Sequence, residues 1–227
     1  MRTAGTPLDR LLKIRPGVIA MIGSGGKTTL AHRLAAALPG RVIFCTTTRI
    51  FPSDTLPNAA DAAQLRRLLD ERRAVCFGTP AEHGKLSAPP LPPEALRRLA
   101  DYILVEADGS AGLPLKAHLA HEPVIPAGSD RVLAVVGASG FGVPIQSAAH
   151  RSDRFAALAG TSPEALATPA HIAAVLRQEG GFDTLIVNQV SNAARRAQAG
   201  VLAAQLPVPA FAGEVRLDHL QRLSSAC

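Results

Sequence analysis

The sequence of residues 18–30 is Val-Ile-Ala-Met-Ile-Gly-Ser-Gly-Gly-Lys-Thr-Thr-Leu. It joins an apolar segment of strand type to a helix through a glycine turn that ends in Lys27-Thr28. Glycines let successive backbone N–H groups converge on one anion, and the N-terminus of the following helix favours negative charge. Lys27 would add a full positive charge near the terminal phosphates of a nucleotide, and the Thr28 hydroxyl is suited to Mg²⁺. The stretch therefore predicts a phosphate-binding loop. The alternative, a glycine turn that only packs helix on strand, leaves the Lys-Thr pair unexplained.

This loop is shorter than the full G-x-x-x-x-G-K-[ST] pattern. Met21 stands six residues before Lys27, and the first glycine, Gly23, comes only four residues before it. The spacing is similar to the G-x-x-G-K-T loops of Mur-type ligases. We expect Lys27 to be exposed at the mouth of the loop. The residues expected to bind the nucleotide phosphates are Gly23, Ser24, Gly25, Gly26, Lys27, Thr28 and Thr29.

Length and composition fit one globular domain that binds anions. The chain has 227 residues, of which 47% are hydrophobic, so we expect a single nucleotide-binding domain over residues 1–227. Its 24 basic and 18 acidic residues give a net charge of +6, which favours anionic partners such as nucleotides. Arginine pairs at 66–67, 72–73, 97–98 and 195–196 are expected on solvated helix faces. Because only 4% of residues are aromatic and none is Trp, we do not expect nucleic acid as a partner.

Cysteine usage and the N-terminal segment indicate a cytoplasmic protein. Cys45, Cys76 and Cys227 form neither a disulfide framework nor a C-x-x-C metal pair, which favours a reducing compartment. Cys45 and Cys76 lie in apolar runs and are expected in the core. The apolar run after Pro16 lasts about six residues, too short for a signal-peptide core or a membrane span.

Short apolar runs alternate with longer amphipathic segments, the pattern of a mostly parallel sheet flanked by helices. The predicted fold class is therefore α/β, a three-layer sandwich like that of P-loop NTPases. Strands are expected near residues 18–22, 42–46, 74–77, 102–106, 132–136, 184–188 and 209–212. Helices are expected from the glycine loop to about residue 38 and near 61–73, 93–100, 152–159, 169–179 and 192–204.

Local signals refine this prediction at helix starts and in two long segments. Thr168 precedes Pro169, which is the signature of a helix N-cap followed by proline, and Ser152 is expected to cap the helix over 152–159. Segments 78–92 and 107–130 are rich in Gly, Pro and His and are too long to be simple connectors. We expect both to be functional loops.

Two carboxylates, Glu106 and Asp108, follow the apolar run over residues 102–105. Ligands of an open parallel sheet lie beyond the carboxyl ends of its strands. At such a position one carboxylate can hold Mg²⁺, directly or through water, while the other orients or deprotonates a water molecule. We therefore expect Lys27, Glu106 and Asp108 to be catalytic, with Thr28 and Asp108 on the metal. The alternative is that the two carboxylates only cap a loop.

Polar side chains also follow two other apolar runs. Thr47 lies among threonines at the end of the second expected strand, and we expect it to contact the ligand, although β-propensity alone explains threonines there. Asn188 stands where many P-loop proteins have a base-binding N-K-x-D element. It would bond the purine, tie its loop to the phosphate loop, or form a plain turn. Gln189 replaces the lysine and Ser191 the aspartate that selects guanine, so the choice between ATP and GTP stays open.

Basic side chains are frequent in the segment after the two carboxylates. His118 and His121 do not have the H-E-x-x-H spacing of a metal site. We expect Lys116, His121 and Arg151 to bind an anionic second substrate or an acidic patch on a partner protein. Loop packing is the alternative role for these residues.

With these motifs together, the sequence resembles the selenium-dependent molybdenum hydroxylase accessory proteins, the family called YqeC, over about residues 18–191. The block over residues 106–126 is the most specific part, because generic P-loop proteins lack it. Ser191 departs from the family's usual Asn-Gln-Val-Asp. The matching motifs are 23–29, 46–48, 84–86, 106–109, 112–116, 121–126, 136–137, 150–151 and 187–190. The resemblance implies a cytoplasmic P-loop protein that binds nucleotide and assists maturation of selenium-dependent molybdenum hydroxylases.

These expectations combine into one functional hypothesis and three rivals, the last of which is a nucleic-acid-binding protein supported only by the net charge. The hypothesis is a Mg²⁺-dependent protein that binds ATP or GTP, hydrolyses it slowly, and acts on a selenium-dependent molybdenum hydroxylase or its cofactor. Slow turnover is expected because such sites depend on positioning that a partner often completes. The first rival is a ligase or transferase that uses the phosphate to activate a small acidic substrate. The second is a nucleotide-gated scaffold without chemistry.

Overall fold

The computed structural model describes residues 7–223, so Cys227 lies outside the described residues. The chain forms two compact units, and the phosphate loop belongs to the second of them up to Lys27. The first unit comprises the chain through Ile22, Thr28–Gly109 and Pro123–Arg131, and the second comprises Gly23–Lys27, Ser110–Glu122 and the chain from Val132. The single domain expected over residues 1–227 stays a prediction.

The first unit is built on parallel strands that are buried on both faces, as expected for a sheet with helices on each side. They are β1 (Gly17–Gly23), β2 (Val42–Thr46), β4 (Asn58–Ala59), β5 (Ala74–Phe77) and β8 (Tyr102–Glu106). Their spatial order is β1-β8-β2-β5-β4. A small antiparallel sheet in the same unit consists of β3 (Arg49–Ile50), β6 (Thr79–Pro80) and β7 (Leu86–Ser87).

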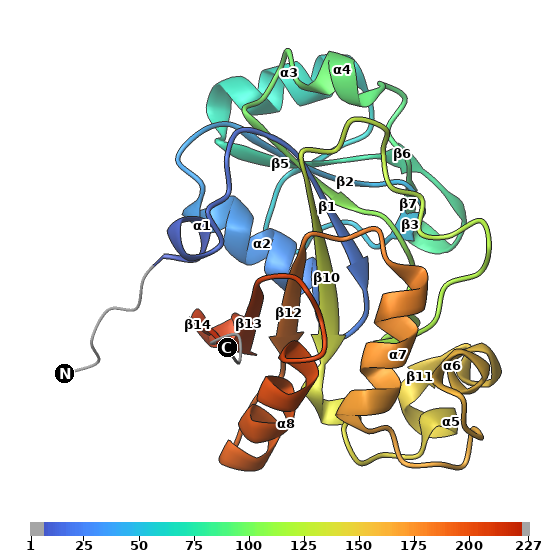
Figure 1. Cartoon of the computed structure of the whole chain (residues 1–227). Helices are drawn as coiled ribbons and strands as arrows, with labels where there is room; N and C mark the ends of the chain where they lie inside the picture. The colour runs from blue at the N-terminus through green and yellow to red at the C-terminus, as the bar shows by residue number, and fades with distance from the viewer. Residues whose placement is uncertain (1–6, 224–227) are drawn as a thin grey trace. The chain divides into compact units, whose positions relative to one another are not determined.

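Helices cover both faces of these strands (Figure 1). The helical elements of the first unit are α1 (Leu8–Leu11), α2 (Lys27–Ala37), α3 (Ala62–Glu71), α4 (Pro93–Leu96) and the 3₁₀ turn Glu82–Gly84. Leu65 of α3 and Leu96 of α4 pack in one cluster with Ile43 and Ile103 of the sheet. On β2, the neighbouring Phe44 contacts His32 of α2 edge to face, with ring centroids 5.4 Å apart. Because successive strand side chains point to opposite faces, α2 covers the face opposite to α3 and α4.

The strands of the second unit are also mostly parallel. Strands β10 (Arg131–Gly137), β12 (Thr184–Asn188) and β13 (Ala210–Glu214) run parallel, and β14 (His219–Arg222) pairs antiparallel with β13. Two short strands, β9 (Leu115–Lys116) and β11 (Ala149–His150), pair with each other. The helical elements are α5 (Ile145–Ala148), α6 (Ser152–Ala159), α7 (Pro169–Glu179), α8 (Ala193–Ala203) and the 3₁₀ turns Ala138–Gly140 and Val215–Leu217. Helix α6 contacts both α5 and α7.

The structure confirms the predicted α/β class, and each predicted strand is present. The cap at Thr168 is also confirmed, since its side chain accepts a hydrogen bond from the His171 N–H at 3.2 Å. The cap at Ser152 is wrong: Ser152 is the first helical residue, and Arg151 precedes it in the left-handed conformation with φ of 62°. The helix predicted over 93–100 ends at Leu96, because the Leu99 N–H bonds the Leu96 carbonyl in a tighter turn.

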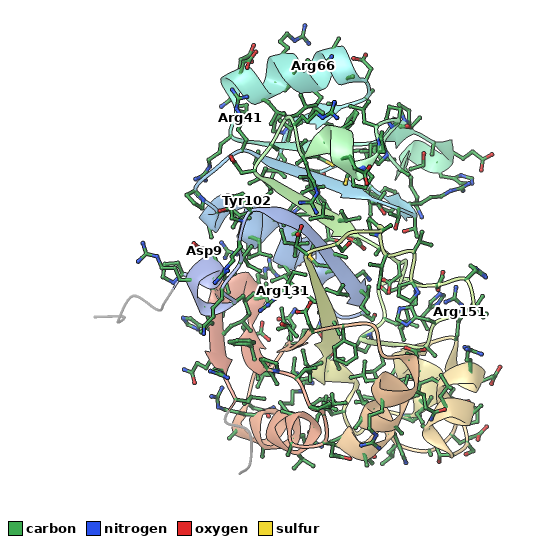
Figure 2. The ribbon with its side chains drawn as sticks, turned by 45° about the horizontal axis from the view of Figure 1, so that its top comes forward. Asp9, Arg41, Arg66, Tyr102, Arg131 and Arg151 are labelled. Carbon is green, nitrogen blue, oxygen red and sulfur yellow. The ribbon has the colours of Figure 1, made fainter. Side chains whose placement is uncertain are left out.

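Other expectations concern exposure. Cys45 and Cys76 are buried, as predicted for core residues. Arg66, on the outer side of α3 in Figure 2, and its neighbour Arg67 are exposed, as expected for a solvated helix face. Between residues 7 and 223, no helix is long and apolar enough to span a membrane.

Candidate functional site

The phosphate loop follows β1 and leads into α2, and its backbone passes so close to its neighbours that a Cβ would clash at its glycines. The Ser24 N–H donates to the Val135 carbonyl at 2.8 Å. Gly25 has φ of +87°, and a Cβ there would lie 2.4 Å from the Gly137 nitrogen. A Cβ on Gly26 would lie 2.4 Å from the amide nitrogen of Asn188. Glycine is therefore required at both positions for the chain to adopt this path.

Lys27 is buried, with a relative exposure of 2%, so the expectation that it is exposed at the loop mouth is wrong. Its ammonium group donates to the carbonyl of Gly23 at 2.5 Å. This bond folds the Lys27 side chain back over its own loop. The buried ammonium group therefore has a carbonyl partner in place of water, as a buried charge requires. The lysine is thus held beside the loop whose anion it is expected to bind.

Asn188 ties the phosphate loop to the rest of the second unit. Its amide nitrogen donates to the Gly25 carbonyl at 2.8 Å, and its amide oxygen accepts from the Val215 N–H at 2.9 Å. Both bonds are buried. Of the roles considered for Asn188, the structure shows the loop tie. Gln189 accepts a hydrogen bond from the Ser139 hydroxyl at 2.5 Å.

Replacing Asn188 by alanine should lower the free energy of unfolding by about 1–3 kcal/mol, because it leaves a buried carbonyl and a buried N–H without their partner. Urea denaturation of the variant and the parent measures this loss. Gln205→Ala, which removes a solvent-exposed amide bond to the Val201 carbonyl, is the control and should change stability by less. Equal stability of Asn188→Ala and the parent would show that the tie is not structural.

In the first unit, the start of α2 contacts the carboxylate that follows β8. The Thr28 hydroxyl donates to the Glu106 carboxylate at 2.8 Å. Glu106 has a relative exposure of 7%, and Asp108 is fully buried. The threonine that directly follows the phosphate-loop lysine is therefore hydrogen-bonded to the first of the two predicted carboxylates, Glu106.

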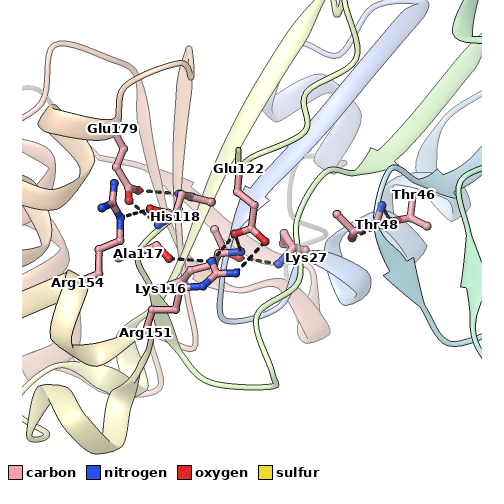
Figure 3. Close-up of polar contacts among 11 residues, drawn as sticks. Lys27, Thr46, Thr48, Lys116, Ala117, His118, Glu122, Arg151, Arg154 and Glu179 are labelled. Carbon is pink, nitrogen blue, oxygen red and sulfur yellow. Dashed lines mark hydrogen bonds and ion pairs between the residues drawn. The ribbon is translucent and has the colours of Figure 1, made fainter. Parts of the chain in front are cut away.

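The threonines after β2 bind the main chain near this carboxylate. The Thr46 hydroxyl donates to the Glu106 carbonyl at 2.7 Å and accepts from the Thr48 N–H at 3.0 Å; Figure 3 shows Thr46 and Thr48 side by side. The Thr47 hydroxyl, the one expected to contact a ligand, donates to the Val124 carbonyl at 2.7 Å. Sequence reasoning missed Thr46, because β-propensity explains a threonine in a strand equally well.

Lys116 and Arg151, expected to bind an anionic ligand together with His121, meet around Glu122 in the second unit (Figure 3). The Lys116 ammonium lies 3.0 Å from a Glu122 oxygen, and its side chain is fully buried. The Arg151 guanidinium donates to both Glu122 oxygens. An anionic ligand would therefore have to displace Glu122. His121 is exposed.

A second polar cluster lies around the buried His118. His118 contacts Glu179 through both its backbone N–H, at 2.6 Å, and its ring Nδ1, at 2.7 Å, while Arg154 donates to the His118 carbonyl. These bonds attach the segment before Glu122 to α6 and α7. Within residues 7–223, no group of three or more His, Cys, Asp or Glu side chains is placed to hold a metal ion.

Glu122 predicts a pH dependence of stability. Hydrogen bonding from Arg151, opposed by burial and assisted by Lys116, lowers the pKa of Glu122 from 4.5 to about 2. The contribution of ionised Glu122 to the free energy of unfolding is therefore present above pH 4.5 and is lost as the pH falls toward 2. The stability difference between the parent and Glu122→Gln should shrink by about 1–2 kcal/mol over this range.

Urea denaturation across this pH range measures that difference. Glu82→Gln, at an exposed ion pair with Arg49 that spans 3.6 Å, is the matched control and should show little pH dependence. A stability difference for Glu122→Gln that is constant between pH 7 and pH 2 would contradict the role of Glu122 as an ionised partner of both cations.

The class of protein follows from this arrangement. A mostly parallel α/β sheet, with a glycine loop ending in Lys27-Thr28 between β1 and α2, is a P-loop NTPase-like fold. The chain belongs to the YqeC family: the family model described as YqeC protein matches residues 19–153. A relative from Escherichia coli K12, described as uncharacterized protein YqeC, is 38% identical over 181 aligned positions, and the match covers 74% of this chain and 70% of the relative.

A solved structure is also similar, at a lower level. It is the crystal structure of the signal recognition particle 54 kDa protein from Aeropyrum pernix K1 in complex with GDP, with a TM-score of 0.44 and 17% identity. The match covers 92% of this chain, but this chain spans only 44% of that chain's length. A similarity at this level says nothing about the ligand of the present chain.

Proposed function

We propose that this chain binds a nucleoside triphosphate together with Mg²⁺ at its phosphate loop and hydrolyses it slowly. The observation that supports this most is the 2.8 Å hydrogen bond from the Thr28 hydroxyl to Glu106, directly after the glycine loop. A glycine turn that served only for packing would need neither the Lys-Thr pair nor a buried carboxylate beside its threonine.

The residues present fit a magnesium ion. Mg²⁺ prefers oxygen ligands and is usually held by one or two protein oxygens plus phosphates and water. Thr28 and Glu106 offer a hydroxyl and a buried carboxylate in mutual contact. We therefore assign the metal side to Thr28 and Glu106, in place of the Thr28 and Asp108 expected from sequence, and the water-orienting role to Asp108. When bound, the ion would neutralise charge on the phosphate oxygens.

Lys27 and the glycines complete the phosphate site in this proposal. An ammonium group has three N–H donors, and the bond to the Gly23 carbonyl uses one of them. In this proposal the Lys27 ammonium donates to a phosphate of the bound nucleotide. The glycine backbone, which Asn188 holds through its bond to the Gly25 carbonyl, supplies N–H groups to the same anion. Because Asn188 is buried and its amide group bonds both the loop and the Val215 N–H, we propose that it does not bind the base.

Membership of the family and the motifs shared with it support the cellular role that we propose. This role is to assist maturation of a selenium-dependent molybdenum hydroxylase in the cytoplasm, through the hydroxylase or its cofactor. Lys116, Arg151 and His121 remain the proposed contact for an acidic partner or substrate. In the described structure, this contact requires release of Glu122.

Phosphate release by the purified chain tests this function against its ligase rival. We expect slow release of phosphate from ATP or GTP by the chain alone, and faster release when the client hydroxylase is added. Many-fold acceleration by a small acidic substrate, without the hydroxylase, would instead favour the ligase or transferase. Tight triphosphate binding without hydrolysis, even with the hydroxylase present, would favour a scaffold and contradict the proposed NTPase activity.

A further inference from the structure

A cavity of about 930 Å³ lies on the flank of α2, within the first unit. One wall is a single face of α2 that includes Thr29, His32 and Arg33. The opposite walls are the loop over residues 54–57 and the turn from α3 into β5, with Arg72 and Arg73. The lining found in the described residues includes Thr29 but neither Lys27 nor Thr28. The cavity therefore lies apart from Lys27 and Thr28, and Thr29, which was expected from the sequence to bind the phosphates, lines this cavity.

The charged groups of this cavity favour an anion. Three arginines line it, against one carboxylate, Asp54. Burial lowers the pKa of His32, and the nearby Asp54 carboxylate opposes this shift. His32 therefore adds little positive charge to the cavity, and the arginines supply most of it. A guanidinium presents five N–H donors in a planar fork that matches phosphate oxygens.

The walls are held in place before any ligand binds. The Ser53 hydroxyl accepts from the Thr55 N–H at 3.2 Å and from the Leu56 N–H at 2.9 Å, which fixes the loop opposite α2. The Arg73 guanidinium donates to the Ala36 carbonyl of α2 at 2.8 Å. This bond orients the guanidinium across the cavity and uses only part of its donor capacity. Less ordering is then needed on binding, which favours affinity.

We propose that this cavity is a second anion site that binds a phosphorylated small molecule of about nucleotide size, held by Arg33, Arg72 and Arg73. The volume lies within the range of about 300–1,000 Å³ that is usual for ligand pockets. The hydroxyls of Thr29 and Thr55 would provide neutral hydrogen bonds to the same ligand. Because Arg33 and Thr29 belong to α2, this ligand would contact the helix that begins at Lys27.

Calorimetric titration of the Lys27→Ala protein with inorganic pyrophosphate, without divalent cations, tests this site apart from the phosphate loop. We expect binding to persist in this background and to weaken at least about tenfold on adding Arg72→Gln with Arg73→Gln. Arg66→Gln with Arg67→Gln, an exposed pair on the preceding helix α3, removes the same charge and should leave the affinity within about twofold.

Arg33→Gln, on α2, tests the same site independently if the Arg72 and Arg73 pair is needed for folding. It should also weaken pyrophosphate binding at least about tenfold. Loss of all pyrophosphate binding in Lys27→Ala alone would overturn the proposal, as would equal weakening by the control pair. Neither outcome bears on triphosphate binding at the phosphate loop, so failure of this site is distinguishable from failure of the proposed function.

Discussion

Replacing Lys27 by alanine should lower the affinity for a Mg²⁺-bound triphosphate more than about tenfold, while the chain still folds. A charge-assisted hydrogen bond to phosphate contributes about 1.5–3 kcal/mol, which is more than a factor of ten in affinity. Because Lys27 is buried and bonded to the Gly23 carbonyl, its removal should also cost about 1 kcal/mol of stability. Calorimetry measures the first effect and urea denaturation the second.

Lys85→Ala is the matched control for this prediction. Its ammonium lies 5.0 Å from the centroid of the exposed Phe51 ring, so the substitution removes the same charge outside the loop. We expect Lys85→Ala to bind triphosphate like the parent. Equal affinity of Lys27→Ala and the parent would rule out this loop as the phosphate site.

Glu106→Gln and Asp108→Asn should separate two functions. Glu106→Gln removes the carboxylate that contacts Thr28, so it should lower the gain in triphosphate affinity that Mg²⁺ provides by about tenfold or more. Asp108→Asn should keep the affinity within about threefold and slow phosphate release about 100-fold, the size of effect typical of a group that orients or deprotonates water. Titrations with and without Mg²⁺ and single-turnover hydrolysis measure the two effects.

If Asp108→Asn instead loses the effect of Mg²⁺ and Glu106→Gln instead slows hydrolysis, Asp108 binds the metal and Glu106 orients the water, as expected from the sequence alone. If both variants bind Mg²⁺ and hydrolyse triphosphate like the parent, the two carboxylates serve only the fold. Stability of both proteins should be measured alongside, since Glu106 and Asp108 are buried.

Much of the fold follows from local patterns in the sequence. The strands of both units are short apolar runs, and burial on both faces makes such runs visible without long-range information. Helix ends were predicted less well. The prediction that Ser152 caps its helix was wrong because Arg151, with a positive φ, is the residue before the helix. An arginine is not a residue type that indicates this conformation.

The candidate site was predictable only where it is continuous in sequence. The glycine loop is recognisable from its own residues, but the bond from Thr28 to Glu106 joins positions 78 residues apart. Burial of Lys27 depends on the path of the loop backbone, which the residue types do not reveal. Arg72 and Arg73 were predicted to lie on a solvated helix face. Their position opposite α2 could not be predicted from the sequence, because it depends on the fold of the whole first unit.

Calorimetric titration of the parent chain with ATP, GTP and CTP, each with Mg²⁺ and with a chelator in its place, tests the central claim most directly. We expect at least one triphosphate to bind at the loop with an affinity that Lys27→Ala lowers, and Mg²⁺ to tighten this binding through Thr28 and Glu106. Absence of binding by all three triphosphates in the presence of Mg²⁺, with folded protein, would contradict it.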